Sequence, residues 1–440
     1  FIEIFSMTPL HSCTSEVLLV LVVACVFGTT FAAQDIKFSP SNAPQCVFAP
    51  TSSNGSWSFV NATSQQSCHG SVAYGYYNAS RYVVGWDQLD VATDSKFEDS
   101  LQAYAAGYFE GFASVQVVRD YYNNMIAPNS YNQSVLAYFE ENWAWMTNES
   151  ARQRNMRNAK KAIHGSKTVT EEVDKIWVQV ELLLEQFQGL LDGLNAATPN
   201  PADRFSKLML ILTSSQGDLS DITTKFPYNS TTDWRTMPKH AFEMWLGLRT
   251  HCSALIRIPD DLSDIYASHA TWQTFSFAIR IYKTLTLRFR SAVAQTIQFS
   301  SYPATFVSTD DFHVLDTGLT VIETSLSVFN MSIYQYVQPQ NSLLSWIRTM
   351  TANRLAVDGT SWSRVFSQYN SGTYNNEWLV VDFNRFEPFN PNPPTNGGVL
   401  TVLNQMPGMV VYADVTTELY TSPNRTRFWP SYNVPYVTYI

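Results

Sequence analysis

Residues 252–269 read CSALIRIPDDLSDIYASH, and the fold prediction starts from this stretch. Apolar and polar side chains alternate along Ser253–Ile258 and alternate again along Leu262–His269. Alternation with a period of two is typical of a strand that buries one face, and a Pro-Asp-Asp sequence between two such runs favours a turn. The stretch therefore predicts a β-hairpin whose turn is centred on Asp260–Asp261.

The position of the turn sets the pairing of the two strands. Arg257 is expected opposite Asp264, an opposite-charge pair of the kind that stabilises neighbouring strands. The same count places Cys252 opposite His269, allowing a shift of a residue or two. The hairpin thus predicts a thiol and an imidazole side by side.

The cysteines outside this stretch have other expected roles. Cys13 and Cys25 lie in the apolar N-terminal region, and Cys46 and Cys68 could close a loop as a disulfide in an oxidising compartment. Cys252 remains as an unpaired thiol. A buried, inert cysteine is the simpler interpretation of such a residue, and a reactive one is the alternative.

The N-terminal region indicates export. Val17–Gly28 is an apolar run of 12 residues, too short for the roughly 20 residues that cross a bilayer. With the small residues that follow, it predicts a signal peptide over residues 1–33, with residues 1–6 upstream of a start at Met7. No Lys or Arg precedes the run, so a buried N-terminal helix is the alternative.

Composition excludes one class of partner and supports export. With a net charge of -9 and no long Lys/Arg cluster, the chain is not expected to bind nucleic acid. Charged residues make up 15%, below the usual share of about 25%, so other groups must cover the surface. No later stretch predicts a transmembrane anchor. Eight N-x-S/T sequons predict a glycoprotein: Asn54, Asn61, Asn78, Asn132, Asn148, Asn229, Asn330 and Asn424.

Periodicity predicts an α+β fold in layers. Residues 34–90 read as strands and loops, and a helical spacing of apolar residues covers about 95–123, 169–194, 203–212 and 271–298. Beyond about Leu343 the chain reads as strands, namely at residues 345–350, 361–369, 377–386, 398–406 and 408–415.

Most familiar catalytic motifs are missing from the sequence. It contains no G-x-S-x-G, H-E-x-x-H, P-loop or G-x-G-x-x-G, and no Cys/His set with metal-ligand spacing. Gly217–Ser220 resembles a GDSL sequence only superficially and is interpreted as a helix-associated turn. Neither a metal nor an organic cofactor is predicted.

A cysteine that opens a strand after a cleavable bond can act as an N-terminal nucleophile. The freed α-amine, with a pKa near about 7.7–8.0, can take the thiol proton without a separate base. Backbone N–H groups and a side-chain amide would then stabilise the oxyanion.

Several motifs, in order along the chain, resemble the phospholipase B-like family. Its members carry HCSALI and SHDTW, close to Thr250–Ile256 and Ser268–Trp272. The resemblance extends from about Gly85 to the last residues, with further matches at Ala103–Gly111, Gly217–Ile222, Ser371–Trp378, Leu400–Asp414 and Phe428–Tyr436.

The resemblance implies an N-terminal nucleophile αββα sandwich in a lysosomal or secreted hydrolase. It implies cleavage between His251 and Cys252, which gives an N-terminal chain of residues 34–251 and a catalytic chain of residues 252–440. The two chains would stay associated. The implied activity is deacylation of phospholipids, or of related acyl esters and amides.

The resemblance also implies roles for individual residues. Cys252 would be the nucleophile in both cleavage and turnover, and His269 and Thr271 would orient the thiol or the bound carbonyl. Asn375 or Asn376 would supply the oxyanion amide. The alternative for both asparagines is a hairpin turn.

Two departures from the family pattern bear on these expectations. Ala270 stands where the family has an aspartate, so the protein could be a catalytically impaired glycoprotein that acts in binding. The sequence ends at Ile440 within a stretch that the family continues, which predicts a C-terminally incomplete sandwich. An N-acyl amidase is a further alternative, and a homodimer is expected by analogy alone.

Overall fold

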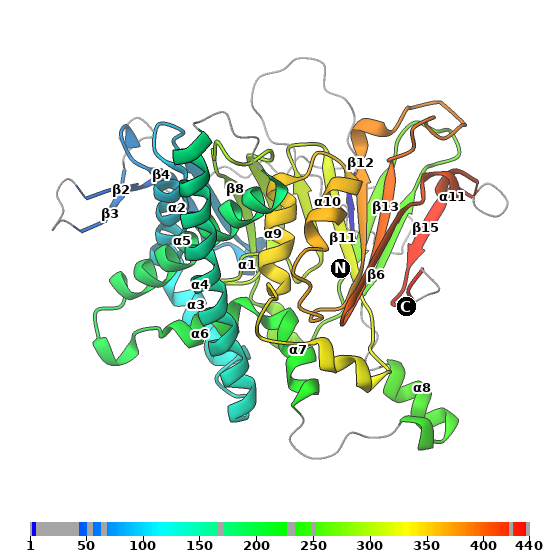
Figure 1. Cartoon of the computed structure of the whole chain (residues 1–440), viewed down its shortest axis with the longest axis horizontal. Helices are drawn as coiled ribbons and strands as arrows, with labels where there is room; N and C mark the ends of the chain where they lie inside the picture. Colours follow the sequence, from blue (N-terminus) through cyan, green and yellow to red (C-terminus); the bar gives the residue numbers. More distant parts are fainter. Residues whose placement is uncertain are drawn as a thin grey trace.

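The protein is described by a computed structural model over residues 2–5, 44–50, 56–62, 68–164, 171–226, 234–247, 252–421 and 426–436. These residues form a mixed α+β fold with two β-sheets and several helices, which confirms the α+β part of the predicted fold class (Figure 1). Most of the predicted signal peptide and the predicted cleavage residue His251 lie outside the described residues.

The larger sheet is mostly antiparallel and contains residues from both sides of Cys252. Among the described strands of this sheet, β5 and β8 alone pair in parallel. Strands β2–β5 precede Cys252 in the chain and β8–β14 follow it, so the two predicted chains share one sheet. The strand order is β14 (Met409–Asp414), β13 (Leu400–Met406), β12 (Asn376–Asp382), β11 (Leu319–Ser325), β10 (Phe312–Leu315), β9 (Thr296–Ser301), β8 (Ile281–Thr286), β5 (Asp87–Thr93), β4 (Ala73–Asn78), β2 (Gln45–Phe48) and β3 (Ser58–Asn61).

The smaller sheet contains the predicted hairpin. Its order is β1 (Ile2–Phe5), β7 (Tyr266–Ala270), β6 (Ser253–Arg257) and β15 (Phe428–Ser431). Ala254 lies opposite His269, and Arg257 lies opposite Tyr266.

The predicted Arg257–Asp264 pair is therefore wrong, because the register is shifted by two residues. The connection is longer than a tight turn: the Leu262 N–H donates to the Pro259 carbonyl, and Leu262 has a φ of 60°. Arg257 instead lies 3.5 Å from Asp260.

The helices lie mostly on one face of the larger sheet. In Figure 1, α2, α4 and α5 are on the left of β12 and β13, and β15 of the smaller sheet is on their right. The helices are α1 (Arg81–Val84), α2 (Asp99–Ala113), α3 (Val115–Met125), α4 (Gln133–His164), α5 (Glu172–Ala196), α6 (Lys207–Ser214), α7 (Gln216–Lys225), α8 (Lys239–Gly247), α9 (Ser345–Leu355), α10 (Gly359–Phe366) and α11 (Thr416–Thr421).

Helices α2 and α5 cross in close contact because both carry glycines at the crossing. A Cβ added to Gly107 of α2 would lie 1.9 Å from the Gln186 backbone oxygen, and one added to Gly189 of α5 would lie 2.0 Å from the Tyr104 backbone oxygen. The close approach of the α5 backbone thus explains why a glycine stands at position 107 of the AYAAGYFEG stretch.

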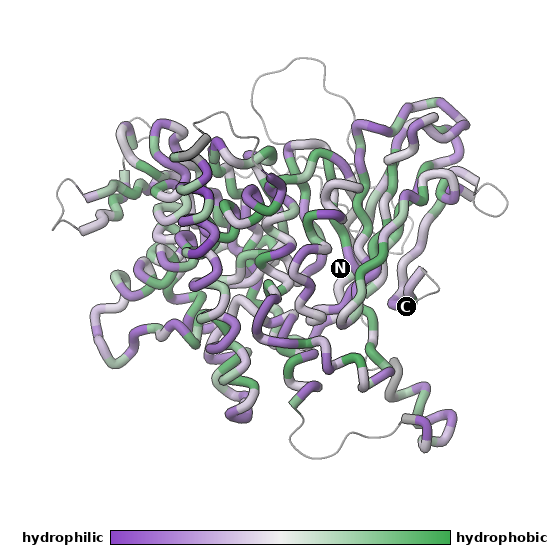
Figure 2. The backbone as a smooth tube through the Cα atoms, in the orientation of Figure 1, coloured by the Kyte–Doolittle hydropathy of each residue, from purple (hydrophilic) through white to green (hydrophobic). Residues whose placement is uncertain are grey.

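The central strands are buried on both faces, which gives three layers. Trp378 and Val380 of β12 pack in the core shared with the helices, and Leu379 and Val381 pack in the core shared with the smaller sheet. Figure 2 shows green, apolar stretches among white and purple ones in this region. Helices, larger sheet and smaller sheet therefore form successive layers.

Three predicted elements are wrong. The helix expected at residues 271–298 is instead β8 and β9, because an apolar spacing of four, as between Ile281 and Leu285, fits a strand as well as a helix. The strands expected at 345–350 and 361–369 are α9 and α10. Nearly every residue of α9 is buried, so no polar face reveals the helical period.

Candidate active site

Cys252 comes immediately before β6 and is buried next to a carboxylate. It is the free cysteine of the described residues and is 5% exposed. Its Sγ donates a hydrogen bond to Oδ2 of Asp311, at 3.2 Å. Asp311 immediately precedes β10 in the larger sheet. The nucleophile predicted from the hairpin therefore meets an acidic residue of the second sheet.

His269 of β7 approaches the same carboxylate. Its Nε2 lies 3.7 Å from Asp311 Oδ2, and its Nδ1 lies 3.3 Å from the Thr271 hydroxyl. The Thr271 hydroxyl donates its single proton to the Asp310 carbonyl, at 3.0 Å. The hydroxyl oxygen can therefore only accept a hydrogen bond from Nδ1–H of His269. Burial lowers the pKa of His269 to about 4. The ring is thus neutral near neutral pH and carries a lone pair on Nε2.

Asp311 is one of a pair of buried acids. The Tyr374 hydroxyl donates to Asp311 Oδ1 at 2.5 Å. Burial raises the pKa of Asp311 to about 6, and burial together with the charge of Asp311 raises the pKa of Glu323 well above its usual range. Glu323 therefore keeps its proton more readily than Asp311 does.

The backbone at this cluster adopts an unusual conformation. Cys252, Asp311 and Tyr374 have φ values of 74°, 71° and 51°, in the left-handed region that disfavours side chains. Each such residue costs of order 1–3 kcal/mol and persists only where the surrounding structure imposes it. Such positions cluster at functional sites, and here three of them are linked through the Asp311 carboxylate.

The two candidate asparagines have different surroundings. Asn375 Nδ2 donates to the Gly372 carbonyl at 2.9 Å, and its Oδ1 accepts from Gln405 at 3.2 Å. Asn376 is 0% exposed, and neither its Nδ2 nor its Oδ1 has a hydrogen-bond partner within the described residues. The amide of Asn376 is therefore the one left available for a ligand.

Asn376 and Glu323 project from the same face of the larger sheet. Asn376 pairs with Ser325, and Glu323 pairs with Trp378 on the neighbouring strands. Residues two apart on a strand share a face, so Asn376 and Glu323 are diagonal neighbours about 7–8 Å apart. This places the free amide beside the acid pair.

Position 270 lies on the other face of β7 from His269. Ala270 pairs with Ser253 and is half-buried, whereas His269 is 3% exposed. Side chains alternate along a strand, so an aspartate at 270 would point away from the His269 side. The carboxylate that contacts the thiol here is that of Asp311.

The thiol is protonated in this arrangement. Burial, followed by the charge of Asp311, raises the pKa of Cys252 well above its usual range. Asp311 Oδ2 is the acceptor within hydrogen-bond distance of Sγ. The geometry therefore offers a base for the thiol proton while the Cys252 nitrogen is still in a peptide bond.

Sequence reasoning missed Asp311 and Glu323. Asp310-Asp311 is an acidic pair just before a strand, but its distance of 59 residues from Cys252 gives no local signal. Tyr374 lies within the SGTYNNEW stretch that resembles the family, which could have marked it.

Two motifs far apart in the sequence hold the Tyr374 loop in place. Asp218 and Asp221 of α7 lie in the GDLSDI stretch. Asp218 accepts from the Thr373 hydroxyl at 2.5 Å, and Asp221 accepts from the Tyr374 N–H at 2.8 Å. Ser220 is exposed and lies within this helix rather than in the turn interpreted from the sequence. The GDLSDI stretch thus positions the site instead of supplying a nucleophile.

Asp221 is expected to make the protein less stable as the pH rises. Burial raises its folded-state pKa from 3.8 to about 6, so the folded chain holds a proton that the unfolded chain loses at lower pH. Stability should fall between pH ~4 and ~6 by roughly 3 kcal/mol, taking about 1.4 kcal/mol per pKa unit. Asp221→Asn mimics the protonated acid. Its free energy of unfolding should therefore not show this fall as the pH rises from about 4 to about 6.

Urea unfolding of both proteins at several pH values between about 4 and 7 measures the effect. Equal slopes for Asp221→Asn and the unchanged protein would contradict the expectation. The exposed Asp260→Asn serves as the matched control.

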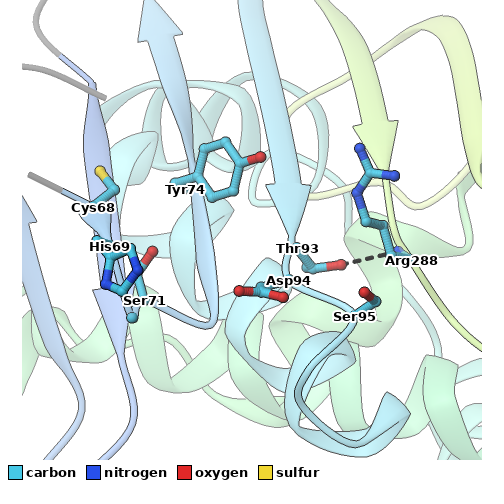
Figure 3. Close-up of a pocket in the computed structure, with 9 residues that line it drawn as sticks. Cys68, His69, Ser71, Tyr74, Thr93, Asp94, Ser95 and Arg288 are labelled. Carbon is cyan, nitrogen blue, oxygen red and sulfur yellow. Dashed lines mark hydrogen bonds between the residues drawn. The ribbon is translucent and has the colours of Figure 1, made fainter. Parts of the chain in front are cut away.

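A hollow among the described residues lies away from this site. It has a volume of about 600 Å³, and Figure 3 shows it beside the disulfide end of β4 and β5, with Tyr74, Asp94 and Arg288 in its wall. The Arg288 N–H donates to the Thr93 hydroxyl at 3.0 Å. None of the candidate catalytic residues lines this hollow.

The features expected of an exported protein are present in part. Cys46 and Cys68, which the cysteine count singles out, are joined by a disulfide. Among the sequons, Asn61, Asn148 and Asn330 are exposed, Asn78 and Asn132 are half-buried, and Asn54, Asn229 and Asn424 lie outside the described residues. None of the described helices combines the length and apolar character needed to cross a bilayer.

Comparison with known proteins identifies the family. A family model described as Phospholipase B matches residues 73–440. Phospholipase B-like protein B of Dictyostelium discoideum is 37% identical over 374 residues, which cover 83% of this chain and 60% of that protein. Phospholipase B-like protein C of the same organism is 35% identical over 375 residues, or 83% and 61% of the two chains. The chain thus spans about 60% of the length of these relatives, and it belongs to the phospholipase B family.

Proposed function

We propose that this chain is the precursor of an acyl hydrolase in which Cys252 becomes an N-terminal nucleophile. The observation that carries the proposal is the 3.2 Å contact of the Cys252 thiol with Asp311, at a residue whose own backbone is in the left-handed region. A nucleophile, a proton acceptor within reach and a strained backbone conformation at the nucleophile all favour self-cleavage.

Self-cleavage would begin with transfer of the thiol proton to Asp311. Sγ of Cys252 then attacks the His251 carbonyl carbon, and the carbon–nitrogen bond to Cys252 breaks as a thioester forms. The departing nitrogen takes the proton from Asp311 and becomes the free α-amine. Water hydrolyses the thioester, which leaves a carboxylate on His251 and restores the thiol.

Turnover would repeat this chemistry on a lipid. Sγ attacks the acyl carbonyl, and the departing alcohol or amine takes the thiol proton by way of the new α-amine of Cys252. Water then releases the fatty acid from the thioester. His269 and Thr271 would orient the thiol, and no metal or organic cofactor takes part.

The layers support an N-terminal nucleophile sandwich. That fold stacks helices, two sheets and helices, and the described residues supply one helical layer and both sheets. Cys252 lies at the start of a strand in the smaller sheet, where the fold would place its nucleophile. The two products of cleavage would stay together because they share the larger sheet.

The disulfide and the exposed sequons support residence in a lysosome or outside the cell. The substrate class we propose is a phospholipid or a related acyl ester or amide, in keeping with the names of the relatives. A homodimer remains an expectation by analogy.

The proposal is tested by expressing the protein through a secretory pathway, removing the glycans and sequencing each N-terminus by mass spectrometry. A chain that begins at Cys252 supports it. Incubation with a phospholipid should then leave a hydroxylamine-sensitive acyl adduct on the peptide that contains Cys252. An uncut, inactive chain would overturn the proposal and favour a binding protein, whereas turnover of N-acyl amides alone would favour the amidase.

Asn376 is the better candidate for the oxyanion amide, because no group in the described fold occupies it. Asn376→Leu keeps the side-chain size and should lower kcat by about 10²–10³-fold. Its stability should stay within about 1 kcal/mol, since no hydrogen bond is lost. Kinetics on a soluble acyl ester and urea unfolding measure the two quantities.

Asn375→Ala is the matched comparison. It loses two hydrogen bonds in the Tyr374 loop and should therefore destabilise the protein. If Asn375→Ala folds normally and loses activity while Asn376→Leu keeps it, the oxyanion role belongs to Asn375.

A further inference from the structure

Three different metal-ligating side chains converge at the site. Cys252 Sγ, His269 Nε2 and one carboxylate oxygen of Asp311 all lie within 4.8 Å of one another. Their closest approaches are 3.2 Å between Sγ and Oδ2 and 3.7 Å between Nε2 and Oδ2. Four-coordinate zinc binds such ligands at about 2.0–2.3 Å, which separates neighbouring ligand atoms by roughly 3–4 Å.

The histidine presents the atom that a metal requires. Thr271 accepts from Nδ1–H because its own proton is used on Asp310, so the lone pair of His269 is on Nε2. This atom is buried and has no hydrogen-bond partner within the described residues. It faces a carboxylate oxygen, so two electron-rich atoms oppose each other unless a proton or a cation lies between them.

The surrounding charge also favours a cation. Asp311 is buried and forms no ion pair with a lysine or arginine of the described part of the chain. The nearby Arg280 is 3.5 Å from Asp310 instead. Buried carboxylates are costly without a counter-charge. A divalent ion would offset that cost.

Hydrogen bonds from neighbouring side chains fix two of the three ligands. Thr271 holds the His269 ring through Nδ1, and Tyr374 holds the second oxygen of Asp311. Outer-shell hydrogen bonds of this type orient metal ligands and set the histidine tautomer.

We propose that Cys252, His269 and Asp311 form a Zn²⁺ site, and that bound zinc inhibits the hydrolase. Binding displaces the thiol proton, and any proton on Asp311, to solvent, and no oxidation or reduction occurs. The sulfur then donates to the ion the lone pair that would otherwise attack a carbonyl carbon. Inhibition, unlike binding, rests on the proposed function. After cleavage the free α-amine of Cys252 adds a ligand, because sulfur and nitrogen of one cysteine close a five-membered ring on the metal.

The experiment measures metal directly, so it does not depend on turnover. The deglycosylated protein is titrated with Co²⁺ and with Zn²⁺, and the metal content is determined after gel filtration. We expect one ion per chain, a thiolate-to-cobalt charge-transfer band in the near ultraviolet, and loss of that band when Zn²⁺ is added. Zinc should also raise the Tm.

Ligand variants locate the site. His269→Ala and Asp311→Ala should weaken binding by more than the roughly 10–100-fold that is typical when a residue hydrogen-bonded to a metal ligand is lost. Cys252→Ala should abolish the charge-transfer band. The exposed His69→Ala and Asp261→Asn are matched controls that should bind as the unchanged protein does.

The outcomes separate the two proposals. Binding without a charge-transfer band, or binding lost in His69→Ala, would mean surface zinc only and would overturn the inference. Hydrolysis that zinc at saturation does not slow would overturn the inhibitory role and leave the hydrolase intact. Specific zinc binding by a protein that never hydrolyses lipid would leave the site standing and remove the proposed function.

Discussion

Replacement of Cys252 by alanine is expected to stop both self-cleavage and lipid hydrolysis. The variant lacks the sulfur that attacks the carbonyl, so kcat should fall by about 10⁴-fold or more, as for other lost nucleophiles. The fold should survive, since the lost side chain is small, although its hydrogen bond to Asp311 is lost. Fatty-acid release and the size of the chain on a denaturing gel are the two measurements.

Two further variants sharpen this result. Cys252→Ser keeps a group that can donate to Asp311 but is a weaker nucleophile, so it should cleave slowly or remain uncut. Ser253→Ala alters the exposed neighbouring residue and should behave like the unchanged protein. A Cys252→Ala protein with full lipid-hydrolase activity would rule out the cysteine mechanism.

Glu110→Gln is expected to destabilise the fold strongly. Glu110 of α2 lies 2.7 Å from Lys283 of β8, and both side chains are buried. Loss of one partner leaves a buried, uncompensated charge, which typically costs about 3–5 kcal/mol. Lys283 also donates to the Thr305 carbonyl at 2.5 Å, so the ammonium cannot move out to water easily.

The same pair connects the two predicted products of cleavage, since Glu110 precedes Cys252 and Lys283 follows it. Urea unfolding gives the free energy. Glu98→Gln is the matched control, because Glu98 pairs with Arg290 in an exposed ion pair worth about 0–1 kcal/mol. The double variant Glu110→Gln/Lys283→Met should recover much of the loss. A cost for Glu110→Gln as small as that of Glu98→Gln would contradict the expectation.

Local patterns predicted the elements that have one polar and one apolar face. The hairpin of β6 and β7 follows from alternation on either side of a Pro-Asp-Asp turn, and residues 95–123 form α2 and α3 as the helical spacing indicates. Patterns failed where burial is complete. Helix α9 is buried on all sides, so its sequence carries no contrast from which a period can be read.

The sequence by itself determined the fold class, the presence of one unpaired thiol at a strand start, and a histidine close to it on the neighbouring strand. The family motifs added the two asparagines. The tertiary structure alone decided the register of the hairpin and the presence of Asp311, Glu323 and Tyr374 around the thiol. A period of two or of 3.6 records which side of an element is buried, but it does not record which strand of another sheet lies across the core. The Cys252–Asp311 contact joins two sheets, and only the packing of those sheets could place it.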